Sequence, residues 1–173
     1  GRLTSALWLT PQMDRLFLEG ASGRRRFMDR LILGLHPDHG GPVSAYDHSM
    51  RSRNKILRDG SRDGEWLDSV EDSMVRHGVA VAVRRLEAVR HLNEMAAGDD
   101  GPFPGAELGM QGRLESWLDD MSALDAEERF REVLATQRDS DRDAGVTTIG
   151  PHRSDLLVHH RHHRELASRC STG

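Results

Sequence analysis

A long run of helical periodicity, from residue 65 to about residue 97, restricts the fold more than any other feature of the sequence. Its apolar positions follow a helical spacing: Leu67, Val70, Met74, Val81, Leu86, Val89 and Leu92. Residues with this spacing share one face of an α-helix, which at ~1.5 Å per residue would be roughly 50 Å long. An earlier helix is expected to open at Gly40-Gly41-Pro42, because proline suits a first helical turn, and turn residues at 59–64 separate the two. This pattern predicts an antiparallel helical arm, with a plain helical bundle as the alternative.

Segments with strand character lie near both ends of the chain. The apolar run at 6–9 is stopped by a Thr-Pro pair, and a helix is expected at 24–35. Further strands are expected at 106–108, 146–149, 155–159 and 165–167. Asp125 is interpreted as the N-cap of a helix that continues to Gln137.

Composition narrows the classes of function. The formal net charge is -4 and the pI is near 6.2, so a nucleic-acid surface would have to be a local patch. Cys170 is the only cysteine, which excludes an internal disulfide and favours a reducing cytoplasm. No apolar run approaches the ~20 residues of a membrane span, and no signal peptide is visible. Because Gly1 is not an initiator residue, we expect the chain to be cut from a longer one.

Several segments, in order, resemble the RecF family of SMC-like, ABC-type ATPases. The first lies at 9–17 (LTPQMDRLF), with Gly20 and then RRRFMDR at 24–30 after it. The second lies at 145–156 and reads GVTTIGPHRSDL. Between them, Tyr46 and the RNKIL segment at 53–57 are similar to the family's Arg-Asn helix, and the final CSTG resembles the opening of its signature motif.

The resemblance implies an α/β fold: a partial ABC-type ATPase lobe, with short strands at both ends of the chain, and an inserted antiparallel helical arm. Residues 1–36 would form a strand, loop and first helix of the lobe, 37–122 the helical arm or lid, and 123–173 the return helix and strands, ending at the start of the signature motif. The family's Walker A loop and Walker B strand are expected outside the sequence, since no G-x-x-x-x-G-K-[ST] occurs. The chain should therefore not hydrolyse ATP by itself.

The resemblance also assigns roles to residues. Ser171, Thr172 and Gly173 would close over the γ-phosphate bound by a partner protomer, because hydroxyl and backbone N–H groups at a helix start bind anions; a chain-end turn is the alternative. Gln12 would be the loop glutamine that reaches magnesium, or else an ordinary loop residue. The family motif near the ATP lobe comprises Gly150, Pro151, His152, Arg153 and Asp155. A structural turn capped by Asp155 explains that motif equally.

Clusters of cations and of histidines suggest further sites. Arginines at 24–26 begin a predicted helix, where positive charge opposes the helix dipole, and contact with DNA phosphate would explain them. The residues of this candidate surface are Arg24, Arg25, Arg26, Arg51, Arg53 and Lys55. Partner acids nearby, such as Asp29, would also explain the arginines at 24–26, and ordinary solvated faces are the alternative for most of the set. Four histidines at 159–163 surround Arg161, but structural zinc needs four convergent ligands, so we interpret them as a polar hairpin tip and predict no metal site.

The resemblance implies an ATP-binding DNA repair protein that binds gaps and single-strand/double-strand junctions as an ATP-gated homodimer. It would promote recombinase loading in recombinational repair, replication restart and the SOS response. ATP with Mg²⁺ would be its cofactor, DNA and recombination mediator proteins its partners, and the full-length protein a weak DNA-dependent ATPase; no membrane partner is expected. Two alternatives remain: a non-enzymatic helical protein–protein interaction module, and a metal-dependent hydrolase built on the histidine-rich end.

Overall fold

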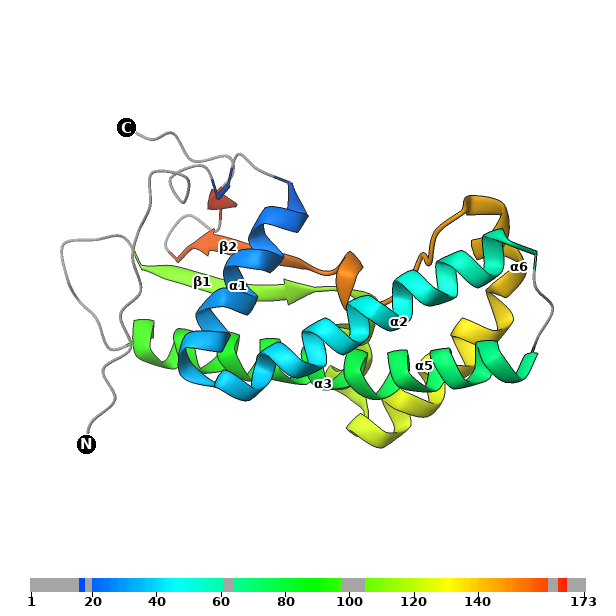
Figure 1. The fold of residues 1–173 in the computed structure, drawn as a ribbon. Helices are drawn as coiled ribbons and strands as arrows, with labels where there is room; N and C mark the ends of the chain where they lie inside the picture. The colour runs from blue at the N-terminus through cyan, green and yellow to red at the C-terminus, as the bar shows by residue number, and fades with distance from the viewer. Residues whose placement is uncertain (1–15, 18–19, 61–63, 98–104, 162–164, 168–173) are drawn as a thin grey trace.

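The computed structural model describes residues 16–17, 20–60, 64–97, 105–161 and 165–167 (Figure 1). The elements in chain order are α1 (Ala21–Leu35), the 3-10 turn η2 (Pro37–His39), α2 (Gly40–Arg58), α3 (Gly64–Ala97), β1 (Ala106–Gln111), α4 (Arg113–Asp120), α5 (Ala123–Thr136), α6 (Arg138–Ala144), the 3-10 turn η3 (Pro151–Arg153) and β2 (Asp155–His160). Helices thus predominate in the described part of the chain, and two strands form its sheet.

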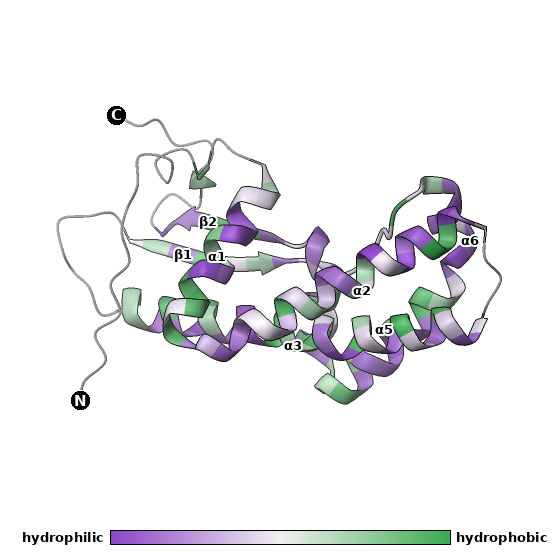
Figure 2. Ribbon diagram, in the orientation of Figure 1, coloured by the Kyte–Doolittle hydropathy of each residue, from purple (hydrophilic) through white to green (hydrophobic). Residues whose placement is uncertain are grey.

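Helices α2 and α3 lie side by side and run in opposite directions, which confirms the predicted helical arm (Figure 1). Gly78 of α3 permits close packing, because a Cβ there would lie 3.0 Å from ring atoms of both Tyr46 and Phe130. The main buried cluster gathers around this contact and includes Met74, Val79, Leu114, Leu134 and Ile149. Figure 2 shows hydrophilic residues alternating with hydrophobic ones along α2 and α3, as expected of helices buried on one side.

Strand β1 pairs with β2 in antiparallel register, from Ala106 opposite His160 to Gln111 opposite Asp155. The sheet packs against α1 and α3 through a second buried cluster formed by Met28, Ile32, Val89 and Leu156. Strand β1 confirms the strand predicted at 106–108 and extends it by three residues to Gln111. Segments far apart in the sequence therefore meet in one small sheet.

The outer edge of β1 is closed by a side chain of α3. The amide nitrogen of Asn93 donates to the carbonyl of Leu108, and its Oδ1 accepts from the Leu108 N–H, both at 2.8 Å. Both backbone groups of Leu108 that face away from β2 are thereby satisfied.

The predicted strand at 146–149 is wrong, because side chains take the backbone groups that a strand ladder would need. The Thr147 N–H donates to Asn54 Oδ1 at 2.8 Å, and the Thr148 N–H donates to Asp141 Oδ1 at 3.0 Å. These bonds hold the segment as an irregular connection between α6 and η3.

Two more expectations need correction. The N-cap of α5 is Ser122, not Asp125: the Ser122 hydroxyl accepts from the Asp125 N–H at 3.2 Å and donates to its carboxylate at 2.6 Å. The strand predicted at 165–167 contributes only an isolated bridge between Leu166 and His159. The strand predicted at 6–9 lies outside the described residues, and none of the described helices is long and apolar enough to cross a membrane.

Candidate functional site

The family-like segment at 145–155 lies where α1, α2 and α3 meet the start of β2, and two hydrogen-bond networks fix it. The first surrounds Arg53, whose side chain is fully buried. Its guanidinium donates to Glu71 at 2.8 Å, Asp141 at 2.7 Å, the Thr147 hydroxyl at 2.9 Å and the Leu134 carbonyl at 2.8 Å. The predicted contact between Arg53 and DNA is therefore wrong, because its donors are used inside the protein and no phosphate can reach them.

The second network begins with the Tyr46–His152 pair. The hydroxyl of Tyr46 lies 2.7 Å from His152 Nδ1, and His152 Nε2 lies 3.0 Å from the Thr147 carbonyl. A carbonyl only accepts, so Nε2 carries the proton and Nδ1 accepts from Tyr46. Burial lowers the pKa of His152 and raises that of Tyr46, so both are neutral around pH 7. Gly150 is required beside them: its φ is +136°, and a Cβ would lie 2.1 Å from the Tyr46 oxygen.

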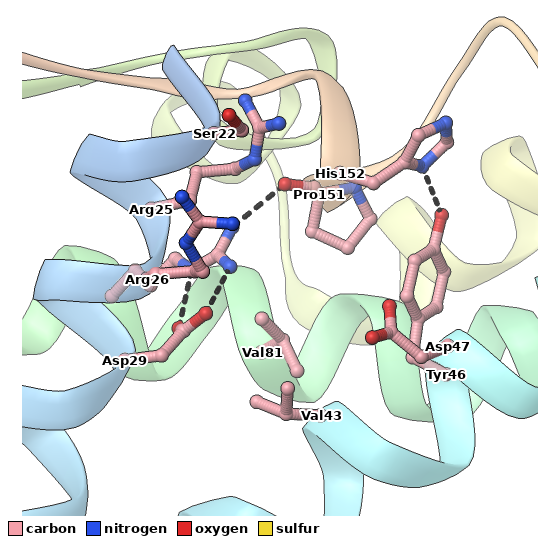
Figure 3. A pocket seen from close by; sticks show the side chains of 11 residues that line it. Ser22, Arg25, Arg26, Asp29, Val43, Tyr46, Asp47, Val81, Pro151 and His152 are labelled. Atoms are coloured by element: carbon pink, nitrogen blue, oxygen red, sulfur yellow. Dashed lines mark hydrogen bonds and ion pairs between the residues drawn. The ribbon is translucent and has the colours of Figure 1, made fainter. Parts of the chain in front are cut away.

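Arg85 of α3 contacts Pro151, the residue between Gly150 and His152. Its guanidinium donates to the Pro151 carbonyl at 2.7 Å and to both carboxylate oxygens of Asp29 at 2.9 and 2.7 Å (Figure 3). Asp29 also lies 3.1 Å from His39 Nε2. Burial opposes ionisation of Asp29, but the hydrogen bonds from His39 and Arg85 outweigh it and lower the pKa of this carboxyl group. Asp29 and Arg85 thus form a satisfied pair that positions η3.

Two arginines at the start of α1 donate hydrogen bonds to the end of the 145–155 segment. Arg24 makes two hydrogen bonds to Asp155, at 2.7 and 2.8 Å, and Arg25 donates to the Ser154 carbonyl at 2.6 Å. The hydroxyl of Ser154 donates to the buried carboxylate of Glu115 at 2.6 Å. The prediction that Asp155 caps a structural turn is replaced by a more specific role, pairing with Arg24 across 131 positions of sequence.

A pocket of about 240 Å³ opens between α1, α2 and η3 (Figure 3). Its charged lining residues are Arg25, Arg26, Asp29, Asp47 and Arg85, and Tyr46 and His152 add polar groups. Most of these side chains already have partners inside the protein, so the pocket has rigid walls. A pocket with several guanidinium groups has the chemistry to hold an anion.

The other predicted residues are scattered. Arg51 and Lys55 are exposed on α2, and Arg51 approaches Asp47 at 3.6 Å. Gln12, Ser171, Thr172 and Gly173 lie outside the described residues. In the part of the chain that the structure describes, no group of three or more possible ligands could hold a metal ion.

Sequence reasoning missed Arg85 and Glu115 as members of the site, and it named Asp29 only as a possible partner of the arginines at 24–26, whereas Asp29 pairs with Arg85. A signal for Arg85 was present, because it lies four residues from both Val81 and Val89 and so falls on the buried face of α3. A charge on such a face is expected to have a buried partner. Nothing in the sequence identified Asp29 as that partner, since the two are 56 positions apart.

Comparisons with known proteins agree with this arrangement. No protein-family model matches the sequence. The chain is 50% identical over 169 residues to the DNA replication and repair protein RecF of Mesorhizobium japonicum, covering 96% of the chain and 45% of that protein. It is 47% identical over 169 residues to the RecF of Brucella abortus, covering 96% of the chain and 44% of that protein. The chain thus spans less than half the length of these relatives.

Two solved structures share the fold. One, described as the recombination mediator protein RecF-ATP in the RecFOR pathway, superposes with a TM-score of 0.76 and 17% identity, covering 87% of the chain and 41% of that structure. A second, described as RecF-ATPrS in the same pathway, gives a TM-score of 0.71 and 18% identity, with coverages of 87% and 42%. The described helices and the two-stranded sheet therefore match part of the fold of these two RecF structures.

Proposed function

The chain belongs to the RecF family, and from that premise we propose that it is part of an ATP-binding protein of DNA replication and repair. The observation that supports this most strongly is its 50% identity over 96% of its length to one such protein. The whole protein would bind DNA at gaps and single-strand/double-strand junctions, act with recombination mediator proteins and promote recombinase loading. Roles in replication restart and the SOS response belong to the same proposal.

ATP with Mg²⁺ would gate dimerisation of the whole protein. In this proposal Ser171, Thr172 and Gly173 contact the γ-phosphate held by the partner protomer, and Gln12 reaches the magnesium. Since ATP would bind the closed pair more tightly than the monomer, it would shift the equilibrium toward the dimer. The division into a lobe (1–36 and 123–173) and a helical arm (37–122) is part of the same proposal.

DNA contacts would fall on the exposed cations. Arg26 on α1 and Arg51 and Lys55 on α2 are exposed, whereas Arg24 is paired with Asp155. Each phosphate contact would lower the logarithm of the DNA affinity by about 0.9 per tenfold rise in salt. A salt titration of DNA binding by the whole protein, with each exposed cation changed to Gln, counts these contacts.

The proposed function is tested by measuring ATP-dependent dimerisation of the full-length protein by analytical ultracentrifugation. We expect Ser171→Ala to leave ATP binding nearly unchanged and to weaken the dimer roughly tenfold or more, since a charge-assisted hydrogen bond contributes about 1.5–3 kcal/mol. Ser44→Ala is the matched control, because Ser44 is exposed on α2. A dimer affinity that is the same in all three proteins would refute the role of Ser171.

A further inference from the structure

Two arginines of the pocket lining, Arg25 and Arg26, form no ion pair with a described carboxylate, and neither does Arg153, which follows the lining residue His152. Arg26 lines the pocket and is exposed on α1, with no ion pair to a described residue. Arg153, in η3, is exposed and makes one long hydrogen bond, 3.4 Å, to the Thr147 carbonyl. Arg25 donates to the Ser154 carbonyl through one nitrogen, and no ion pair with a described carboxylate neutralises it.

The carboxylates near these arginines are already engaged. Asp155 is paired with Arg24, Asp29 is paired with Arg85, and Asp47 lies 3.6 Å from Arg51. Each of these pairs has no net charge, so the positive charges at 25, 26 and 153 are left in excess. Burial, followed by the nearby positive charges of Arg85 and Arg153, lowers the pKa of Arg25, although the carboxylates of Asp155 and Asp29 act in the opposite direction.

The pocket itself limits what can enter. Its volume of about 240 Å³ is below the ~300–1,000 Å³ of pockets that hold drug-sized ligands, so it can enclose only a small group. Its floor is rigid, because Arg85 and Tyr46 are fixed by their bonds to Asp29, Pro151 and His152 (Figure 3). Arg25 and Arg26 extend from α1 along one wall. A small polyanionic group meets these requirements, since guanidinium groups bind phosphate oxygens through several N–H donors.

We propose that this pocket is a phosphate-binding site, in which Arg25 and Arg26 of the lining hold the phosphate group and Arg153, next to the lining residue His152, adds positive charge beside it. The phosphate comes either from a nucleic-acid strand or from a free phosphate compound. The first source rests on the DNA binding proposed above, whereas the binding of phosphate itself does not.

The test uses the 173-residue chain, which contains no Walker A loop to bind phosphate elsewhere. Inorganic phosphate is titrated into the chain at constant ionic strength, with chloride as the balancing salt, and binding is followed by calorimetry. We expect saturable binding that Arg26→Gln weakens roughly 10- to 100-fold, the factor that one charge-assisted hydrogen bond supplies. Arg153→Gln should weaken it by a smaller factor, because Arg153 lies outside the lining and acts through its charge. Both residues are exposed, so the variants keep the fold.

The control is Arg90→Gln, which removes the same charge from an exposed arginine of α3 outside the pocket. Unchanged binding in this variant supports the site. A short single-stranded oligonucleotide that displaces inorganic phosphate identifies nucleic acid as the source, and failure to displace it identifies a free phosphate compound. Absence of saturable binding overturns the proposal, as does an equal loss in all three variants. Neither result bears on the dimerisation assay of Ser171, which is made on a different property of the full-length protein.

Discussion

Replacing Arg53 with alanine is the sharpest test of how the described residues are held together. The substitution removes the only fully buried guanidinium among them, together with four hydrogen bonds that join α2 to α3, α5, α6 and the connection at Thr147. The two acidic partners, Glu71 and Asp141, are themselves buried and would be left inside the protein. We expect a large loss of the free energy of unfolding.

The size of this loss depends on which partners the carboxylates of Glu71 and Asp141 keep after the substitution. Glu71 keeps an ion pair with Arg138, so its charge is still partly balanced. Asp141 keeps hydrogen bonds from Thr148 but loses the only cation that forms an ion pair with it in the described chain. Breaking a buried pair by removing one partner costs about 3–5 kcal/mol, and the compensation at Glu71 places this variant near 3 kcal/mol. In a chain of this size that loss lowers Tm by about 6–12 °C.

The assay is urea denaturation of the chain followed by far-UV circular dichroism, with Arg51→Ala as the control. Arg51 is two residues away on the same helix, but its side chain is 77% exposed and its ion pair with Asp47 is worth at most about 1 kcal/mol. The double variant Arg53→Ala with Asp141→Asn should recover part of the loss, because it removes the unpaired charge. A loss for Arg53→Ala no larger than that for Arg51→Ala would show that this network does not stabilise the fold.

Three further variants probe the second network. Gly150→Ala should cost about 3 kcal/mol in urea denaturation, from a positive φ and a clash with Tyr46 that the glycine avoids. His152→Gln should flatten the decrease in stability at acid pH: because the folded-state pKa of His152 is lowered, the unfolded chain takes up protons first as the pH falls below 6.5. Arg24→Gln should cost about 2 kcal/mol in thermal melts, since it removes the paired hydrogen bonds to Asp155.

Each of these three predictions has a result that would contradict it. Gly109→Ala, at a glycine with open space around it, should cost much less than Gly150→Ala, and equal costs would remove the steric argument. A stability–pH profile that is identical for the native chain and His152→Gln would show that His152 does not titrate differently on folding. A melting temperature unchanged by Arg24→Gln would mean that solvent screens this partly exposed pair.

Helices and their order were predictable from the sequence because their signals are local. The apolar stripe from Leu67 to Leu92 places α3 correctly, and Pro42 marks the first turn of α2. The error at 146–149 had a physical source: β-branched residues such as Thr147 favour strands, but the long-range hydrogen bonds that Thr147 donates to Asn54 override that preference. Such partners, 93 positions away, leave no periodic trace in the sequence.

The candidate site was predictable only in part. The segment 150–155 was chosen as a candidate for its resemblance to a family, but the sequence could not distinguish its structural residues from its exposed ones. The structure separates them: His152 and Asp155 are engaged inside the protein, whereas Arg153 is exposed. Arg53 illustrates the opposite difficulty, since an arginine in a run of cations resembles a surface residue until its acidic partners are known.

The side chain of Asn93 determines which edge of the two-stranded sheet can accept a further strand. It occupies the backbone groups of Leu108 that an additional strand would need, so no neighbour can pair along the whole of β1. On the opposite side of the sheet, His159 of β2 forms an isolated antiparallel bridge with Leu166. Strands contributed by other parts of a longer protein would therefore extend the sheet beyond β2, and two copies of this chain cannot aggregate by joining their β1 edges.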